Sequence, residues 1–474
     1  MVNAPPRVVI AAPASGAGKT TVATGLMAAL RGKGNTVAPG KVGPDYIDPG
    51  YHALATGRPG RNLDPVLIGE DLIAPLFRHA ARDADIAVIE GVMGLFDGRI
   101  GTDGFGSTAH VATLLGAPVL LVVDARGQAR SLAALLSGFR AYDPAVRLAG
   151  VILNQVGSDR HEEVLRAACD EVGLPVFGAL RRGADVELPS RHLGLVPAVE
   201  HGAPAVRAVD AMADLVARSV DLDGIVRVAR GAGDLPNNAC FSPVTAIGGI
   251  PVTKRECVVA VAGGAVFTFG YAEHAELLRA AGAEVVAFDP LTESALPSGT
   301  SAVVLPGGFP EQHGPALSAN VLLRKEIADF ARSGGVIEAE CGGLLYLAEE
   351  VDGQPMCGVL PAVGSLGSRL TLGYRDAVAA GDSVSYRAGE RVTGHEFHRT
   401  VLTPARGATP AWHWRGADGR PVAEGFSLDR VHASYLHTHP AAQPQTIARL
   451  VAAASARPAS ARPVSALPVS EGLK

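Results

Sequence analysis

The stretch RVVIAAPASGAGKTT, residues 7–21, leaves few folds open to this chain. An apolar run typical of a buried strand leads into a glycine-rich turn and then into a helical pattern. Gly16 and Gly18 let the backbone close around phosphate oxygens, Lys19 adds a point charge, and the Thr20 hydroxyl can ligate Mg²⁺. We therefore predict an ATP-binding P-loop between the first strand and the first helix of a parallel sheet. Its candidate residues are Ser15, Gly16, Ala17, Gly18, Lys19, Thr20 and Thr21.

Two positions of this loop depart from known patterns. Pro13 replaces the first glycine of GxxxxGK[ST], and Ala14 stands where chromosome-partitioning ATPases carry a second lysine. The alternative is an ordinary glycine-rich turn. Strand, loop, GKTT and helix in this order favour the P-loop, whereas a partitioning ATPase would lack its signature residue.

Short apolar runs alternate with helical stretches along both halves of the chain, which is typical of doubly wound parallel α/β sheets. In the first half, strands are expected at Arg7–Ala12, Asn35–Gly40, Asp85–Glu90, Pro118–Asp124 and Leu148–Asn154, and helices at Thr20–Gly32 and Ala129–Tyr142. In the second half, strands are expected at Cys257–Ala262, Glu284–Phe288, Ala302–Pro306 and Gly335–Glu340, and helices at Ala272–Ala281 and Val321–Ser333. The predicted division is a domain over 1–220, a Gly/Pro/Asn-rich linker over 221–254, a domain over 255–450 and a disordered tail over 451–474.

The loop KVGPDYIDPGYH, residues 41–52, is dense in ionisable groups. It follows the second strand, and ligands of parallel sheets bind at the carboxyl ends of strands. A polar loop held by Pro44 and Pro49 is the structural alternative. We expect Asp45 and Asp48 to contact Mg²⁺, ATP or the substrate instead.

Two further acidic residues are expected at the same edge of the sheet, where the parallel strands end. The strand DIAVIE ends in Glu90, and GVMGLFDG then brings Asp97. Because a P-loop is already present, we predict metal or substrate contacts rather than a solvated strand end. The predicted metal ligands are Thr20, Asp45 and Glu90. Asn154 ends the fifth strand, where related nucleotide-dependent synthetases use an Asn to contact adenine.

The segment GVIEAECGGLLYL, residues 335–347, predicts a second catalytic site. A strand runs into Cys341, two glycines follow, and a helix begins, as in a nucleophile elbow. We expect the helix N-terminus to lower the pKa of the thiol. The backbone of Gly307 and Gly308, in AVVLPGGFPEQ, is predicted to form an oxyanion hole with that of Gly342.

A histidine about a hundred residues later completes the predicted pair. SYLHTHP supplies His437 and His439, and the order Cys then His suits a class I glutamine amidotransferase acting on L-glutamine. Most such enzymes carry a Glu two positions after the His, where this chain has His439. The third member of the triad is therefore absent or replaced. TGHEFHR brings together His395, Glu396 and His398, for which interdomain structure is preferred over a metal site.

Composition excludes several other classes. The net charge is −5 with no long Lys/Arg run, so a nucleic-acid partner is not expected. The chain has no run of about 18 or more apolar residues, so a membrane span is not expected. Five scattered cysteines without a CxxC pair suggest no disulfide framework, which favours the cytoplasm.

With these motifs assembled, residues 7 to about 450 resemble the cobyrinate and hydrogenobyrinate a,c-diamide synthases. The resemblance rests on APASGAGKTT, KVGPDYIDPGYH, IEGVMGLFDG, PGGFPE, ECGGLLYL, LTLGYR, TGHEFHR and SYLHTHP, in the family's order. It implies a dethiobiotin-synthetase-like P-loop domain followed by a flavodoxin-like class I amidotransferase domain. It also implies amidation of the a and c acetates of a corrin ring by way of acyl phosphates, with ammonia from glutamine.

Several alternatives stay open on the sequence alone. The same chemistry suits cobyric acid synthase or nickel-sirohydrochlorin diamide synthase, and a partitioning ATPase with a non-catalytic second domain is a different class. The Ala/Gly/Arg-rich composition suggests a high-GC bacterium with late cobalt insertion, which favours hydrogenobyrinate over cobyrinate. A homodimer is kept as an open alternative for the assembly of the chain.

Overall fold

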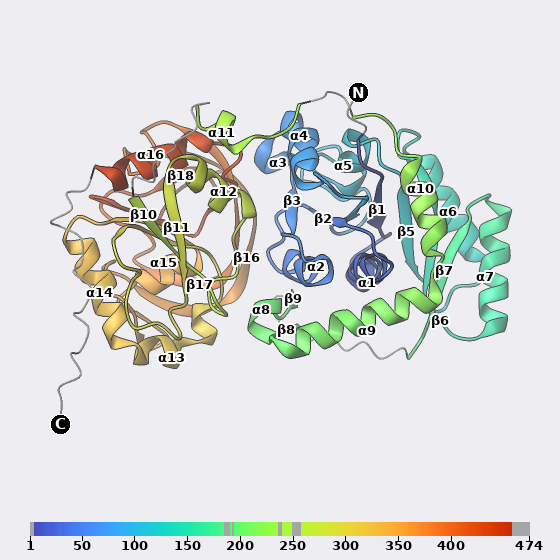
Figure 1. Cartoon of the computed structure of the whole chain (residues 1–474), viewed down its shortest axis with the longest axis horizontal. Helices are drawn as coiled ribbons and strands as arrows, with labels where there is room; N and C mark the ends of the chain where they lie inside the picture. The colour runs from blue at the N-terminus through green and yellow to red at the C-terminus, as the bar shows by residue number, and fades with distance from the viewer. Residues whose placement is uncertain (1–3, 184–189, 192–193, 236–238, 249–256, 457–474) are drawn as a thin grey trace. The chain divides into compact units, whose positions relative to one another are not determined.

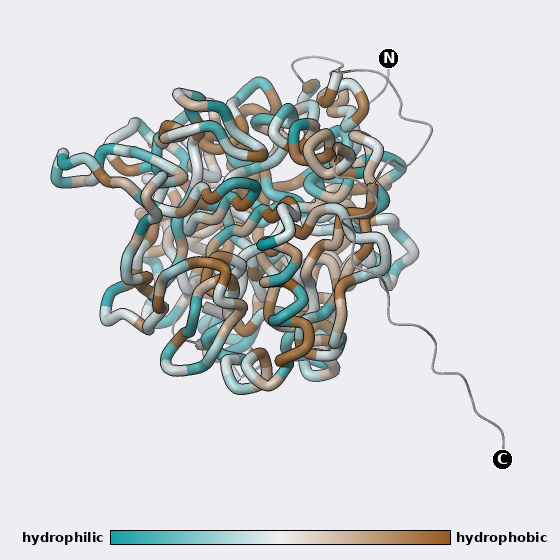
Figure 2. The backbone as a smooth tube through the Cα atoms, turned by 90° about the vertical axis from the view of Figure 1, so that its left-hand side faces the viewer, coloured by the Kyte–Doolittle hydropathy of each residue, from teal (hydrophilic) through white to brown (hydrophobic). Residues whose placement is uncertain are grey.

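The computed structural model describes residues 4–183, 190–191, 194–235, 239–248 and 257–456 of the chain. It divides into two compact units, Met1–Ser242 and Pro243–Lys474. No helix among the described residues is long and apolar enough to cross a membrane. Hydrophilic loops project from the surface, including the one that reaches furthest to the left in Figure 2.

The first unit is built on a seven-stranded parallel sheet in the order β3-β2-β4-β1-β5-β6-β7. Its strands are β1 (Arg7–Ala11), β2 (Val37–Val42), β3 (Arg61–Leu63), β4 (Ile86–Glu90), β5 (Val119–Asp124), β6 (Leu148–Val156) and β7 (Val176–Arg181). The central strands β1 and β4 are buried along their whole length, which explains their unbroken apolar runs. The predicted doubly wound sheet is confirmed.

Helices cover both faces of this sheet. They include α1 (Lys19–Gly32), α2 (Asp48–Thr56), α4 (Glu70–Ala80), α5 (Thr108–Leu114), α6 (Ser131–Tyr142), α7 (Asp159–Glu171) and α9 (Ala203–Ser219). Figure 1 shows α1, α2 and α9 together on one side and α4 and α5 on the other. Gly25 permits the close approach of α1 and α9, because a Cβ there would lie 2.4 Å from the backbone oxygen of Met212. This packing holds the helix that follows the P-loop.

Part of the segment predicted as a linker is helical. Helix α10 (Leu222–Arg230) is capped by the Asp221 side chain, which accepts a hydrogen bond from the Gly224 N–H. It packs against β1 and β7 inside the first unit, with Leu222, Ile225 and Ala229 buried at helical spacing. The unit boundary therefore falls at Ser242, and residues 249–256 of the predicted linker lie outside the described residues.

The second unit contains a six-stranded sheet in the order β11-β10-β12-β13-β21-β20. Its strands are β10 (Cys257–Ala262), β11 (Ala283–Phe288), β12 (Thr300–Leu305), β13 (Val336–Glu340), β21 (Val431–Ser434) and β20 (Phe426–Leu428). All neighbours are parallel except β20 with β21. The helices include α12 (Ala272–Ala280), α14 (Val321–Arg332), α15 (Gly342–Leu347) and α16 (Pro444–Ser455). The second predicted α/β domain is thereby confirmed.

An additional sheet, which the sequence did not predict, is built around the long hairpin of β16 (Val363–Ala379) and β17 (Arg391–Thr403). It also contains β14 (Glu350–Val351), β15 (Gln354–Pro355), β18 (Trp412–Arg415), β19 (Pro421–Glu424) and β22 (His437–Thr438). Strand β22 pairs with β17, with His437 opposite His395. Helix α16 extends to Ser455, into the segment predicted as a tail, and residues 457–474 lie outside the described residues.

Candidate active sites

The predicted P-loop lies between β1 and α1, as the sequence indicates. Gly16 and Gly18 adopt positive φ angles of 80° and 98°, which side-chain-bearing residues rarely reach. The Nζ of Lys19 donates to the backbone oxygens of Met93, at 2.5 Å, and Ala14, at 3.3 Å. Burial and the neighbouring Lys41 ammonium lower the pKa of Lys19. The loop thus presents a partly desolvated lysine at a helix N-terminus, where phosphate binds well.

Strand register brings the charged groups together beside this loop. Lys41 at the end of β2 lies opposite Glu90 at the end of β4, and Ile10 of β1 lies on the other side of Glu90. Lys41 is only 3 % exposed, and its Nζ lies 2.5 Å from Asp48 Oδ2 and 3.0 Å from Glu90 Oε1. Thr20 Oγ1 donates to the same Glu90 oxygen at 2.7 Å and lies 3.4 Å from Asp48 Oδ2. A hydroxyl, an ammonium and two carboxylates therefore converge next to the phosphate loop.

Glu90 is the centre of this cluster. Its Oε2 lies 2.7 Å from Nε2 of the buried His52. Burial alone would favour the neutral acid, but Lys41, His52 and Thr20 outweigh it and hold the pKa of Glu90 at about 2. Burial likewise disfavours the Lys41 ammonium, but Asp48 and Glu90 raise its pKa well above the usual value. Within this cluster, the buried Lys41 ammonium is thus paired with the carboxylates of Asp48 and Glu90.

The other predicted residues of this site have different partners. Asp45 Oδ1 accepts hydrogen bonds from the N–H groups of Ile47 and Asp48, and its Oδ2 lies 3.6 Å from Lys41. Asp48, rather than Asp45, is the aspartate within reach of Thr20.

Asp97 and Asn154 both contact the loops around the phosphate site. Asp97 Oδ2 accepts from the Gly94 N–H at 2.9 Å. The Asn154 side chain donates to the Ala17 oxygen of the P-loop at 3.0 Å and accepts from the N–H of the next residue. In this structure Asn154 therefore supports the loop, and an adenine contact stays a prediction.

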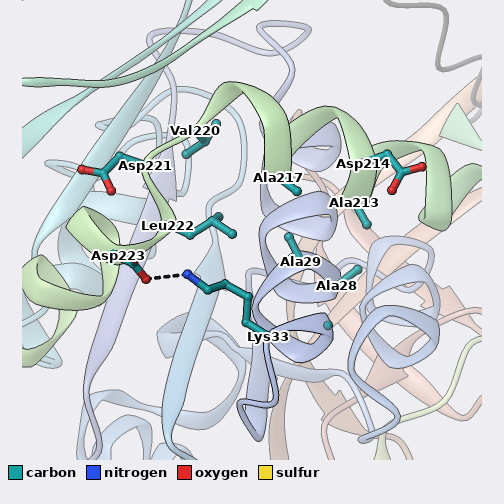
Figure 3. A pocket seen from close by; sticks show the side chains of 11 residues that line it. Ala28, Ala29, Lys33, Ala213, Asp214, Ala217, Val220, Asp221, Leu222 and Asp223 are labelled. Atoms are coloured by element: carbon teal, nitrogen blue, oxygen red, sulfur yellow. Dashed lines mark hydrogen bonds and ion pairs between the residues drawn. The ribbon is translucent and has the colours of Figure 1, made fainter.

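A hollow of 530 Å³ lies between α1 and α9, away from the residues predicted to be catalytic. Figure 3 shows Lys33, Asp214 and Asp221 around it, with Lys33 paired to Asp223. Lys33 follows the C-terminal end of α1, about 20 Å from the P-loop by the length of the helix. The acids would repel phosphate, so this hollow is not the nucleotide site.

The predicted nucleophile of the second site, Cys341, lies on a sharp turn between β13 and α15. Cys341 has φ 47° and ψ −99°, a strained conformation, and its side chain is buried. Only glycine fits behind it: a Cβ at Gly343 would lie 2.1 Å from the Leu305 backbone oxygen, and one at Gly342 would lie 2.8 Å from the Gly308 nitrogen. The sequence therefore folds into the elbow that the CGG motif predicts.

The predicted oxyanion groups divide into two kinds. The backbone N–H groups of Gly308 and Gly342 both act to lower the pKa of the Cys341 thiol, against the effect of burial. Gly307 instead makes room for the imidazole, because a Cβ there would lie 2.3 Å from His437 Cε1. N–H groups that favour negative charge beside the nucleophile are what a developing oxyanion needs.

The expectation of a lowered thiol pKa is wrong. Burial raises the pKa of Cys341, the Glu311 carboxylate adds to this, and the Gly342 and Gly308 N–H groups oppose it only in part. The short helix α15 does not overcome the loss of hydration. Burial therefore favours the neutral thiol of Cys341, and forming a thiolate there would call for a base.

His437 is buried at the same end of the sheet as Cys341. β13 ends next to β21, where Glu340 lies opposite Ser434, and His437 follows three residues later. Its Nδ1 lies 3.6 Å from Glu340 Oε2. Sequence reasoning missed Glu340, although its place directly before the nucleophile was a signal. His439 packs on Tyr271 at 4.1 Å between ring centroids and accepts a hydrogen bond from the Ala441 N–H.

The TGHEFHR motif forms an ion-pair cluster on β17. Glu396 lies 2.6 Å from Arg375 Nε and 3.4 Å from His398 Nε2. His398 stacks on Tyr435 with centroids 3.8 Å apart. In the part of the chain that the structure describes, no group of three or more His, Cys, Asp or Glu side chains is arranged to hold a metal ion.

Comparisons with known proteins agree with this two-site architecture. Residues 8–196 match the CobQ/CobB/MinD/ParA nucleotide binding domain, and residues 258–445 match the CobB/CobQ-like glutamine amidotransferase domain. The chain is 61 % identical to a hydrogenobyrinate a,c-diamide synthase of Mycobacterium tuberculosis, covering 94 % of this chain and 98 % of that one. It is 57 % identical to that of Streptomyces coelicolor, covering 95 % and 97 %. Identity to a cobyrinate a,c-diamide synthase of Synechococcus is 40 %, covering 94 % and 97 %. The chain therefore belongs to the family of hydrogenobyrinate and cobyrinate a,c-diamide synthases.

Proposed function

We propose that this protein uses ATP and glutamine to convert the a and c acetate carboxylates of hydrogenobyrinate to amides. The observation that carries the proposal is the presence of two separate sites in one chain. One has a P-loop lysine beside a hydroxyl and paired carboxylates, and the other has a cysteine on an elbow with a histidine at the same sheet end. Carboxylate activation and ammonia release need these two sites.

In the glutaminase half, Cys341 attacks the amide carbon of glutamine and His437 takes its proton. The neutral thiol makes this base essential, because burial disfavours a free thiolate. The N–H groups of Gly308 and Gly342 stabilise the oxyanion of the tetrahedral intermediate. His437 then gives this proton to the amide nitrogen as the C–N bond breaks, so that ammonia leaves, and water hydrolyses the thioester to glutamate.

In the synthetase half, a substrate carboxylate attacks the γ-phosphorus of ATP and ADP leaves. Lys19 neutralises charge on the transferred phosphoryl group. Ammonia then attacks the acyl phosphate and phosphate leaves, giving the amide. Phosphorylation is needed because an unmodified carboxylate oxygen is a poor leaving group.

Mg²⁺ fits the donor set beside the P-loop. Thr20 Oγ1, Asp48 Oδ2 and Glu90 Oε1 are hard oxygen donors. The Thr20 oxygen lies 3.4 Å from the Asp48 oxygen and 2.7 Å from the Glu90 oxygen. When bound, the cation would neutralise charge on the β and γ phosphates. We assign Thr20, Asp48 and Glu90 to hold it, and keep Asp45 and Asp97 as predicted contacts of the substrate.

The ring substrate is assigned from the degree of similarity. Identity reaches 54–61 % to relatives named hydrogenobyrinate a,c-diamide synthase, against 40–42 % to relatives named for cobyrinate. Both rings carry the same peripheral acetates, so we expect cobyrinate to be accepted more slowly. The reaction uses ATP, glutamine and a free thiol, and the reducing cytoplasm is the compartment that we propose for it.

Two variants and two nitrogen sources test the proposal. Cys341→Ala should abolish glutamine-dependent amidation of hydrogenobyrinate, followed as mass gain, but retain turnover with ammonium chloride. Lys19→Ala should abolish turnover with either source, because no acyl phosphate can form. Cys240→Ala, at an exposed cysteine, is the control and should match the wild type. Wild-type protein that amidates neither hydrogenobyrinate nor cobyrinate would contradict the proposal.

A further inference from the structure

We propose that Glu340 is the positioning carboxylate of the glutaminase site, which holds His437 in place of the Glu that other class I enzymes carry two positions after the histidine. The inference deepens the proposed function and rests on it for the identity of the reaction. The contact that supports it joins Glu340 to His437, which are far apart in the sequence, whereas the usual Glu follows the histidine by two positions.

The first support is geometric. Glu340 Oε1 accepts hydrogen bonds from the N–H and the Oγ1–H of Thr438, at 3.1 and 3.0 Å. These bonds fix one carboxylate oxygen and leave Oε2 facing His437 Nδ1 at 3.6 Å. That separation exceeds a hydrogen bond, but catalytic contacts in ligand-free enzymes commonly tighten when the reactant binds. A carboxylate at Nδ1 would keep the proton on that nitrogen and the lone pair on Nε2, as a base requires.

The second support is the charge of the surrounding groups. Burial would raise the pKa of Glu340, but His437 and the Thr438 N–H lower it, so that this carboxylate is ionised. Other ionisable groups nearby are closer to neutral. Burial raises the pKa of Glu338 on β13 to about 7 and lowers that of His432 on β21 to about 4. Burial also lowers the pKa of His274 on α12.

Glu311 completes the set of charged groups. It follows the Gly307-Gly308 turn on the 3₁₀ helix Pro310–Gln312 and acts on Cys341, whose pKa it raises. Glu340, in contrast, makes the described ion pair with His437. When His437 takes the proton of Cys341, the imidazolium gains the attraction of the Glu340 carboxylate.

His439 is unsuited to this role despite its position in the sequence. It supplies no carboxylate, and its Nδ1 faces the Ala441 N–H while its ring packs on Tyr271. The exchange is chemically consistent, because Glu340 precedes Cys341 directly at the end of β13, and the neighbouring strand β21 ends three residues before His437. The proposed orienting group thus lies at the end of β13, directly before the nucleophile.

The test compares Glu340→Gln and Glu340→Asp with Glu338→Gln, a buried carboxylate on the same strand that hydrogen-bonds Ser385. Gln keeps an acceptor for Thr438 but loses the charge. We expect Glu340→Gln to lower kcat for glutamine hydrolysis about 10²–10⁴-fold with little change in KM, by analogy with loss of the triad carboxylate elsewhere. Glu340→Asp should recover part of this, and Glu338→Gln should stay close to the wild type.

Two further readouts separate positioning from structure. The acidic limb of the kcat/KM profile for glutamine should move to lower pH by about one unit or more in Glu340→Gln, since the imidazolium loses its counter-charge. Ammonia-dependent amidation should stay within about twofold, because it uses the other site. Equal losses in Glu340→Gln and Glu338→Gln, or an unchanged pH profile, would overturn the inference. Glutamine hydrolysis alone suffices for this test, so an error in the ring substrate would leave its outcome readable.

Discussion

Replacing Lys41 with methionine removes the buried ammonium that Asp48 and Glu90 share. Methionine keeps most of the volume, so the change is mainly one of charge. Without Lys41, the pKa of Glu90 should rise from about 2 toward its usual value of 4.5. At about 1.4 kcal/mol per tenfold change in proton affinity, that rise corresponds to about 3 kcal/mol of lost stability at neutral pH. Breaking a buried ion pair costs about 3–5 kcal/mol in general, and the His52 contact places this case at the lower end.

Magnesium provides the second half of this prediction. If Thr20, Asp48 and Glu90 hold a cation, Mg²⁺ should still bind in Lys41→Met and offset part of the lost positive charge. With a dissociation constant of about 1 mM, about 10 mM Mg²⁺ would restore roughly 1.4 kcal/mol. Urea denaturation followed by hydrogen-exchange mass spectrometry would measure this, because peptides from α1 report the first unit separately.

Lys33→Met is the matched control. Lys33 pairs with Asp223 at the surface, where the two side chains are 46 % and 72 % exposed. Such a pair contributes less than about 1 kcal/mol, and Mg²⁺ should not affect its loss. The reasoning is refuted if Lys41→Met costs no more than Lys33→Met, or if Mg²⁺ leaves the stability of Lys41→Met unchanged.

Three further predictions concern substitutions of single residues. Asp48→Ala should lower turnover with either nitrogen source at least about tenfold while the protein stays folded, as circular dichroism would show; an activity loss explained by unfolding would contradict a site role. Glu338 has a folded pKa of about 7, above its usual 4.5, so the stability it supports at low pH is lost as pH rises through this window. Glu338→Gln should therefore flatten the urea midpoint between about pH 4.5 and 7, and an unchanged slope would refute this. Gly343→Ala should destabilise the second unit by about 1–3 kcal/mol, because its Cβ would lie 2.1 Å from the Leu305 oxygen; an unchanged urea midpoint for that unit would contradict the tight elbow.

The sequence alone was sufficient for features carried by contiguous residues. The P-loop, the elbow at Cys341 and the alternating strands and helices each depend on local spacing, because glycines permit the turns and apolar periodicity marks buried faces. Five of the seven strands of the first sheet and four of the six strands of the second were predicted to within a few residues for the same reason, whereas β3, β7, β20 and β21 were not predicted. Helix α10 was missed because it is short and lies among glycines, although its apolar spacing was readable.

Tertiary structure decided the contacts that cross the sheets. Asp45 and Asp48 are equivalent in the sequence, but the turn at the start of α2 gives Asp45 to the backbone and Asp48 to Thr20 and Lys41. Glu340 reaches His437 from 97 residues away only because β13 and β21 are neighbours. The pKa of Cys341 likewise depends on burial by several elements, which reverses the effect expected of its helix. Side-chain direction and desolvation follow from packing between distant segments, and a local pattern carries no record of them.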